Sequence, residues 1–285
     1  MKKMMTALML AALAASLATV SASAEEVTQE EQANYSVSVG ADVMSAYVSK
    51  GVVGNDEPVL QPDVYVEMPF GFSFDVWANK NLTDAKCNWD PETQGKWSEF
   101  DLTLDWTAPL EGPVSVTVGG TYFAYPQAED VAVVVATEEE AVEVDSHNPG
   151  DGGYELFAKV GVDCILQPSL GFYHDCRSSD DWYILAKIGH DIELTDLLTL
   201  GLGGTVSFSG EDFADRNYGS SEGAAFSHAQ VDAKLNYAVT DAFDVYAKCT
   251  FSTLIDKDIR DGIEDSYDDI DCDFFYGGIG VGYTF

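Results

Sequence analysis

Apolar residues alternate with glycine and polar residues at the carboxy-terminal end of the chain. Five apolar positions there are separated by two residues or a multiple of two: Phe275, Ile279, Val281, Tyr283 and Phe285. Successive side chains of a strand point to opposite faces, so this period predicts a strand with one apolar face and one small, polar face. A last strand of this kind, ending on an aromatic residue, is typical of bacterial outer-membrane barrels.

The same alternation recurs along the chain and predicts about twelve strands. Their approximate ranges are 35–47, 59–68, 70–78, 99–107, 114–125, 153–165, 167–174, 182–194, 198–209, 225–239, 243–251 and 271–285. After residue 24 no run approaches the roughly 20 apolar residues that a spanning helix needs, and in lipid only helices and closed barrels satisfy every backbone group. The pattern therefore predicts an all-β fold, a transmembrane antiparallel up-and-down β-barrel over residues 35–285.

The connections between these strands alternate strictly in length. Short connections fall at 68–70, 108–113, around 166, at 195–197 and at 240–242, and longer polar ones fall at 48–58, 79–98, 126–152, 175–181, 210–224 and 252–270. Outer-membrane barrels combine short periplasmic turns with long extracellular loops. With the carboxy terminus in the periplasm, every short connection falls inside and every long one outside. The alternation therefore predicts a location in the cell outer membrane.

The amino terminus has the features of a secretory leader. Lys2 and Lys3 precede an uncharged apolar run that ends at the small-residue pattern Ala22-Ser23-Ala24. This order predicts a signal peptide over 1–24, with an uncleaved membrane helix as the alternative. Residues 25–34 form a short acidic segment before the first strand.

The formal net charge of −35 limits the partners of the protein. Nucleic acid is excluded, because phosphate binding depends on lysine and arginine. Small solutes or cations, divalent metal ions or basic partners are favoured, beside outer-membrane lipid and lipopolysaccharide. Five cysteines leave at least one unpaired within a monomer. The oligomeric state is left open.

The polar face of each predicted strand points into the barrel. The candidate pore-lining residues are Asp42, Asp63, Asp75, Asp101, Asp105, Lys159, Lys187, Lys234 and Lys248. The aspartates lie on the first four strands and the lysines on later ones. We expect these two groups of strands to form opposite walls of the barrel. Such a transverse field orients dipolar or zwitterionic solutes. The alternative is a plugged interior in which these side chains pair and pack, because isolated charges are costly away from water.

Glycines on two late strands are expected to face the bore, where small residues let the walls approach. They are Gly201, Gly203, Gly204, Gly277, Gly278, Gly280 and Gly282. Their spacing does not fit a phosphate-binding loop.

Two loops carry further hypotheses. The apolar run Val131–Ala136 in loop 126–152 is expected either to fold inward as a constriction or to extend the barrel as a hairpin. In loop 252–270, Asp256, Asp258 and Asp261 are weak candidates for a Ca²⁺ or Mg²⁺ site. Because the EF-hand spacing fails, we expect a solvated acidic loop, and no metal or cofactor is predicted. A further hypothesis is that this loop bridges divalent ions to lipopolysaccharide phosphates.

Enzyme signals are weak. By strict alternation only His228 among the histidines falls on the inner face, and its neighbour Ser227 points the other way. No Ser/His/Asn grouping stands out, so no enzyme activity is predicted, and a lipid-modifying barrel enzyme is the least favoured alternative.

The first strands also carry a recognisable motif. The segments Tyr47-Val48-Ser49-Lys50-Gly51, Gln61-Pro62 and Val76-Trp77-Ala78-Asn79 resemble the TorF-like porin family. The family usually has arginine at the position of Lys50. The resemblance implies an outer-membrane β-barrel and a pore, and it carries no substrate and no functional residues.

Together these features predict an outer-membrane pore for passive diffusion of small solutes. The acidic loops predict a mild preference for cations. The alternative is a non-conducting structural or adhesive barrel that binds a partner or lipopolysaccharide through those loops.

Overall fold

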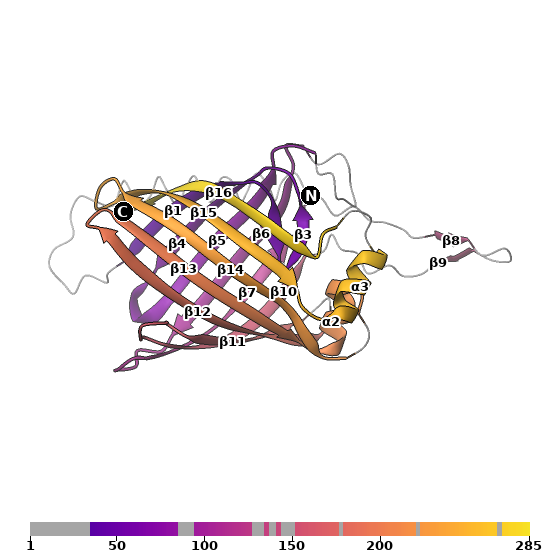
Figure 1. The fold of residues 1–285 in the computed structure, drawn as a ribbon. Coiled ribbons are helices and arrows are strands. Elements are labelled where there is room, and N and C mark those ends of the chain that lie inside the picture. Colours follow the sequence, from indigo (N-terminus) through magenta and orange to yellow (C-terminus); the bar gives the residue numbers. More distant parts are fainter. Residues whose placement is uncertain are drawn as a thin grey trace. The chain divides into compact units, whose positions relative to one another are not determined.

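Twelve antiparallel strands close into one barrel in the computed structural model, which describes residues 35–84, 94–126, 134–136, 141–143, 152–176, 179–220, 223–266 and 270–285 (Figure 1). The strands are β1 (Ser36–Met44), β4 (Val59–Glu67), β5 (Phe72–Asn81), β6 (Trp97–Thr107), β7 (Val114–Ala124), β10 (Gly153–Val162), β11 (Ser169–Asp175), β12 (Asp181–Thr195), β13 (Leu198–Ser209), β14 (Ala225–Ala238), β15 (Phe243–Leu254) and β16 (Asp273–Thr284). The predicted fold class is confirmed. The predicted signal peptide and acidic segment lie outside the described residues.

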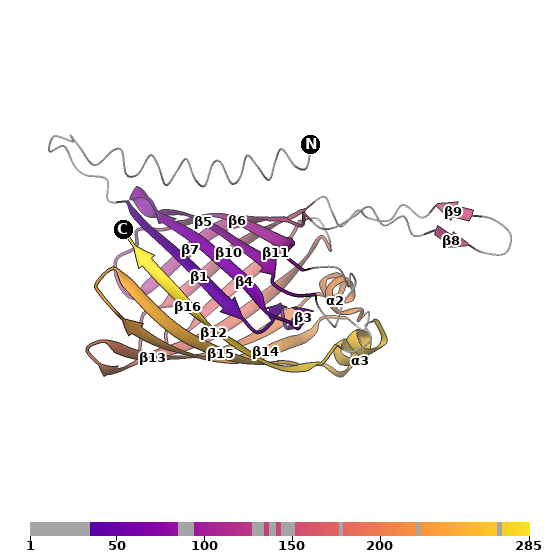
Figure 2. The same ribbon diagram turned by 90° about the horizontal axis from the view of Figure 1, so that it is seen from above.

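The barrel closes where the first and last strands pair. β1 and β16 run antiparallel from Ser38 opposite Thr284 to Met44 opposite Gly278, and they lie side by side in Figure 2. The hydroxyls of Ser38 and Thr284 are 2.9 Å apart, within hydrogen-bonding distance. Because every strand has a partner on both sides, the barrel has no unpaired edge, as lipid requires.

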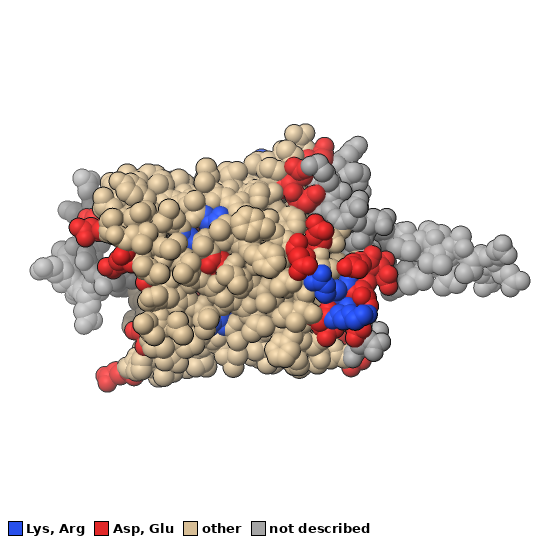
Figure 3. All heavy atoms as spheres, in the orientation of Figure 1, with Lys and Arg blue, Asp and Glu red and all other residues tan. Residues whose placement is uncertain are grey.

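The outer surface of the barrel is apolar. Side chains of alternate positions project outward, and large ones such as Leu104 (54% exposed) and Ile279 (67% exposed) meet no protein. In Figure 3 the strands in view are largely free of charged side chains, which gather mainly at the end carrying the helices. Exposed leucine, isoleucine and phenylalanine on this scale are stable only against hydrocarbon. The period-two pattern of the sequence therefore specifies a lipid-facing wall.

The two ends of the barrel differ. Five short turns and the carboxy terminus share one end, which we assign to the periplasm. The turn between β4 and β5 contains a 3₁₀ turn, η1 (Pro69–Gly71), in which Phe70 and Gly71 have φ of 66° and 84°. The indole N–H of Trp106 donates to the Phe70 carbonyl at 3.0 Å. An aromatic side chain thus anchors this turn at the interfacial level.

The long connections contain elements that the sequence pattern did not predict. They are the hairpin strands β2 (Tyr47–Ser49) and β3 (Val52–Asn55) and the helices α2 (Glu211–Tyr218) and α3 (Lys257–Ser266). A second strand pair, β8 (Val134–Ala136) with β9 (Ala141–Glu143), lies in loop 126–152. Of the two alternatives for loop 126–152, its described part forms a hairpin, β8 with β9, that does not join the barrel sheet. Among the described residues, no helix has the length and apolar character needed to cross a membrane.

Both helices have local signals that a search for period two overlooks. The carboxylate of Asp256 accepts hydrogen bonds from the N–H groups of Asp258 (2.9 Å) and Ile259 (3.4 Å), which caps the start of α3. Ile259 and Ile263, four apart, bury one face of that helix. In α2, Phe213 and Ala214 lie one turn from Tyr218, and Gly219 ends the helix with φ of 69°.

Candidate functional site: the barrel interior

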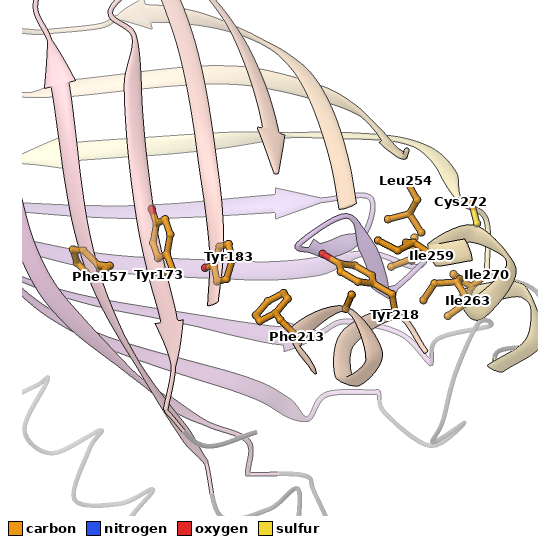
Figure 4. Close-up of a cluster of buried hydrophobic side chains, with 12 residues drawn as sticks. Phe157, Tyr173, Tyr183, Phe213, Tyr218, Leu254, Ile259, Ile263, Ile270 and Cys272 are labelled. Atoms are coloured by element: carbon orange, nitrogen blue, oxygen red, sulfur yellow. The ribbon is translucent and has the colours of Figure 1, made fainter. Parts of the chain in front are cut away.

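The extracellular half of the interior is filled by a buried apolar cluster (Figure 4). Its members come from the barrel wall, from β3, from both helices and from the segment before β16: Val53, Phe157, Tyr173, Tyr183, Phe213, Ala214, Tyr218, Leu254, Ile259, Ile263, Ile270 and Cys272. The rings of Tyr173 and Tyr183 stack at 4.7 Å, and Phe213 of α2 lies 4.7 Å from Tyr183. The helices therefore pack against the inner wall and close this end.

The β2–β3 hairpin folds inward and is part of the same closure. The Tyr47 hydroxyl donates a hydrogen bond to Glu99 of β6, and the Asn55 amide donates to Asn81 of β5 at 2.8 Å. Val53 is fully buried. Polar contacts thus hold the base of the hairpin to the strands on its own side of the barrel.

The tip of the hairpin reaches the other side. β10 is separated from β1 by β4 to β7 in one direction and by β11 to β16 in the other. The Lys50 ammonium nevertheless lies 3.6 Å from the carboxylate of Glu155 on β10. It also lies 5.2 to 5.5 Å from the ring centroids of Phe123, Tyr183 and Phe213, a cation–π arrangement. Lys50 therefore spans the bore.

The backbone at this tip permits the turn. Lys50 and Gly51 have φ of 52° and 85°. A Cβ at position 51 would lie 2.6 Å from Cβ of His228, so only glycine fits against the wall. The Tyr218 hydroxyl donates to the Lys50 carbonyl at 2.9 Å. Burial raises the pKa of Tyr218 well above its ordinary value, so this phenol remains a donor.

The sequence did not identify Lys50 as an interior residue, since it lies in a connection between predicted strands. The available signal was the short alternation on both sides of Lys50-Gly51, which fits a hairpin. The motif that carries the TorF-like resemblance therefore includes the residues that close the bore.

Two residues that were predicted to lie on opposite walls, Asp42 and Lys248, are in contact. The Lys248 ammonium lies 2.5 Å from the Asp42 carboxylate. β1 and β15 both flank β16, and the inward positions of β16 opposite Asp42 and Lys248 are Gly280 and Gly278. With no side chain between them, the two charges meet. The expectation that aspartates and lysines lie on opposite walls is therefore wrong for this pair.

Other predicted aspartates also lie beside glycine. Asp63 of β4 is opposite Gly40 of β1, and Asp105 of β6 is opposite Gly119 of β7. Asp105 accepts a 2.5 Å hydrogen bond from Ser73. Asp75 lies on β5, within electrostatic reach of Asp63 and Asp105, and Asp101 lies beside buried Glu99. The first four wall strands thus form one acidic sector.

The predicted lysines have aromatic neighbours more often than acidic ones. Lys159 lies 4.0 Å from the Phe157 ring centroid, and Lys234 lies 3.7 Å from that of Tyr246. Within the described part of the chain, Lys187 has no hydrogen-bond or ion-pair partner. Lys187, Asp191 and Lys234 face inward and are nevertheless exposed to solvent.

These exposed groups line a cavity of about 650 Å³ in the periplasmic half of the barrel. Its polar and charged lining comes from β12, β13, β14, β15 and the β10–β11 turn: Gln167, Lys187, Asp191, Thr199, Thr205, Asp232, Lys234, Asn236 and Asp244. The interior is thus divided into an apolar, filled outer half and a polar, hollow inner half.

Several sequence expectations need correction. Gly204 is opposite Ile188 and Gly277 is opposite Cys249, so both belong to the lipid-facing set. A register shift in β14 between the pairs of Val206 and Phe208 brings Ser227 and His228 to the same side, and both are buried. Ser227 therefore does not point away from His228, because the bulge adds a residue to the alternation.

Neither the catalytic candidate around His228 nor the metal-site candidate in loop 252–270 forms a site among the described residues. The nearby charges that act on His228 are those of Lys187 and Lys50, and its Nδ1 has no hydrogen-bond partner among the described residues, so no acid or amide side chain orients the ring as in a catalytic triad. Asp256 caps α3 and Asp261 bonds to Lys257, so these carboxylates and Asp258 do not converge. No group of three metal-ligand side chains occurs in the described ranges.

Of the cysteines, Cys164, Cys176, Cys249 and Cys272 are free thiols, and Cys87 lies outside the described ranges.

A closed antiparallel barrel with an apolar belt, a polar inner face and unequal ends defines the class of outer-membrane β-barrel proteins. The chain is a protein of the cell outer membrane. It belongs to a family described as bacterial protein of unknown function (Gcw_chp), whose model matches residues 28–261. The family model does not carry the TorF-like name, so that resemblance stays a prediction. No curated protein matches the sequence.

Solved barrels of similar architecture are distant. The NanC porin matches with a TM-score of 0.47 and 11% identity, covering 87% of this chain and 98% of that one. The KdgM porin matches with a TM-score of 0.47 and 9% identity, covering 88% and 99%. An outer membrane channel from Pseudomonas putida F1 matches with a TM-score of 0.46 and 8% identity, covering 91% and 100%. At these values the likeness does not extend to function.

Proposed function

We propose that this protein is an outer-membrane channel for passive diffusion of small solutes. The observation that carries the proposal is the solvent exposure of Lys187, Asp191 and Lys234 on the inner wall. Unpaired charges are stable in a barrel only if water reaches them, because their transfer to a dry interior costs several kcal/mol or more. The inner half of the barrel is therefore a water-filled vestibule.

The channel has to open at its outer end. Loop elements, and not barrel strands, close that end. The side chain of Lys50 crosses the bore and contacts Glu155. Loops move without loss of the strand pairing that holds the barrel together, and hinge or loop motion is a common form of gating. Release of the β2–β3 hairpin from β10 is the step that we assign to opening.

A mild preference for cations is part of the proposal. The net charge of −35 and the acidic sector of Asp63, Asp75 and Asp105 both raise the local concentration of cations. Lys159, Lys187 and Lys234 reduce this preference without reversing it.

Single-channel recording in a planar bilayer with a potassium chloride gradient tests both parts. We expect discrete conductance steps and a reversal potential of the sign for cations. A reversal potential that favours chloride would contradict the cation preference. Absence of conductance in the wild type and in Lys50→Met alike would contradict the pore.

A non-conducting structural or adhesive barrel is the second candidate. The buried cluster at the outer end favours it, since twelve residues pack there as in a protein core. In this role the acidic loops bind lipopolysaccharide through divalent ions, or a basic partner. Lipopolysaccharide binding that requires Mg²⁺, in a protein that passes no solute in liposomes, would support this candidate over the channel.

A further inference from the structure

The inner wall of the vestibule has a hollow with a floor of glycine. Gly189 of β12 is opposite Gly203 of β13, and Gly201 of β13 lies two positions before Gly203 on the same face. None of these residues has a side chain to fill the space above the sheet. The hollow forms part of the 650 Å³ cavity, and pockets of roughly 300–1,000 Å³ hold small ligands.

Charged side chains of both signs surround this floor. In one row across three strands, Asp191 of β12 is opposite Gly201, which is opposite Lys234 of β14. In the next row, Gly203 is opposite Asp232. Lys187 precedes Gly189 by two positions on β12. Each side of the hollow therefore presents one ammonium and one carboxylate.

These four groups are not paired with one another. In the described part of the chain, Lys187, Asp191, Asp232 and Lys234 form no ion pair, whereas Asp42 and Lys248 on the same inner face do. Strand spacing is the same in both cases, since β1 and β15 flank β16 as β12 and β14 flank β13. The Lys234 ammonium lies over the Tyr246 ring instead, and Lys187 and Asp191 project from one strand, four positions apart.

Both carboxylates, those of Asp191 and Asp232, lie over the glycine floor. A Cβ at Gly201 would lie 2.9 Å from a carboxylate oxygen of Asp191, and one at Gly203 would overlap the carboxylate of Asp232. The Lys234 ammonium lies over the Tyr246 ring at the rim, and Lys187 has no hydrogen-bond or ion-pair partner among the residues that the structure describes. Acceptors for an ammonium group thus lie at the floor, and donors for a carboxylate lie beside them.

We infer that this hollow is a binding subsite for small zwitterions, such as free amino acids. Lys187, with Lys234 at the rim, takes the carboxylate of the solute, and Asp191 with Asp232 takes its ammonium group. A solute with both charges satisfies both pairs at once. A neutral solute of the same size satisfies neither, and an anion or a cation meets repulsion from one pair. The inference rests on the proposed channel function and names its substrate class.

Liposome swelling with alanine and with lactamide, an uncharged molecule of similar size, tests selectivity. We expect alanine to enter roughly two- to fivefold faster, as exposed ion pairs allow. The ratio should fall to one in Lys187→Gln and in the double variant Asp191→Asn/Asp232→Asn, with lactamide entry unchanged. Lys257→Gln is the matched control, since this lysine also loses one charge but lies on α3 with its side chain 82% exposed.

Binding is measured separately, because swelling depends on the open channel. Saturation-transfer NMR on the full-length protein in detergent, with alanine as the probe, requires no transport. Saturable alanine binding that is lost in both variants supports the subsite. Equal entry of alanine and lactamide together with no saturable binding overturns it. Entry of neither solute, with alanine binding intact, overturns the channel and leaves the subsite standing. Variants are compared only where they keep the heat-dependent gel shift of a folded barrel.

Discussion

Lys50 at the tip of the β2–β3 hairpin contacts Glu155 of β10, with 3.6 Å between the ammonium and the carboxylate. The two residues lie on different sides of the barrel, and their contact closes the bore. The Glu155 side chain is only 5% exposed, so its charge depends on this lysine. The hairpin therefore adds a contact across the bore to the closure that the helices and the buried cluster form at the outer end.

Replacement of Lys50 by methionine should open the channel more often. Glu155 would lose its cationic partner in a buried setting, which costs about 3–5 kcal/mol when one member of a buried pair is removed. The hairpin would then leave its seat, and planar-bilayer recording should show a higher open probability. Lys50→Arg is the control, because it keeps the charge and matches the residue usual in the TorF-like family. An open probability equal to that of the wild type in Lys50→Met would contradict the role of this contact.

Gly280→Ala should weaken the closure of the barrel. The added methyl group would overlap both the Asp42 carboxylate and the Tyr246 ring. Overpacking of this kind costs about 1–3 kcal/mol. The temperature of the heat-dependent gel shift should therefore fall. Gly204→Ala is the control, since its Cβ would face lipid with Ile188 at 3.5 Å. Equal shifts in the two variants would contradict the close approach at Gly280.

Exchange of the charges of Asp42 and Lys248 should preserve the stability of the barrel and its selectivity, while single changes should alter both. Lys248→Met leaves the Asp42 carboxylate unpaired on the inner wall, and Asp42→Asn does the same to the Lys248 ammonium. The first should move the reversal potential further toward cations and the second toward anions. The double exchange, Asp42→Lys with Lys248→Asp, should return both stability and selectivity toward the wild type. Additive single effects, with no recovery in the exchange, would show that the pair does not act as a unit.

The closure should loosen in alkali through Tyr218. Burial raises the pKa of this phenol in the folded state above its unfolded value. A group of this kind stabilises fully below the unfolded pKa, near 10, and the contribution is lost as the pH rises above it. Protease access to the hairpin should therefore increase above about pH 10. Tyr218→Phe should have a shallower pH dependence and a hairpin that is about 0.5–1.5 kcal/mol less stable at neutral pH, from loss of the bond to Lys50. Tyr35→Phe, at an exposed tyrosine, should match the wild type.

The wall of the barrel could be predicted because each strand carries its own evidence. Residues such as Val281, Tyr283 and Phe285 alternate with glycine or a polar residue regardless of the distant chain, and lipid outside the barrel makes that alternation obligatory. The error at Gly204 contradicts the alternation itself, since Gly203 and Gly204 are adjacent and point to opposite faces. The error at Ser227 has another cause. A single bulge in β14 shifts which residues share a face, and alternation alone does not reveal a bulge.

The interior could be predicted only in part. Asp42 and Lys248 were assigned to the inner face from the period, but not as partners, since their contact depends on β16 lying between β1 and β15. Lys50, α2 and α3 fall in connections, where a period of two gives no information.

The sequence by itself determined the strands, their inward and outward faces, the unequal ends and the outer-membrane class, because these follow from local alternation in contact with lipid. Only the tertiary structure decided which charges meet, that the β2–β3 hairpin crosses the bore to Glu155, and that a glycine-floored hollow lies between Lys187 and Asp232. Those features depend on barrel closure and strand register, which bring together residues that are far apart along the chain.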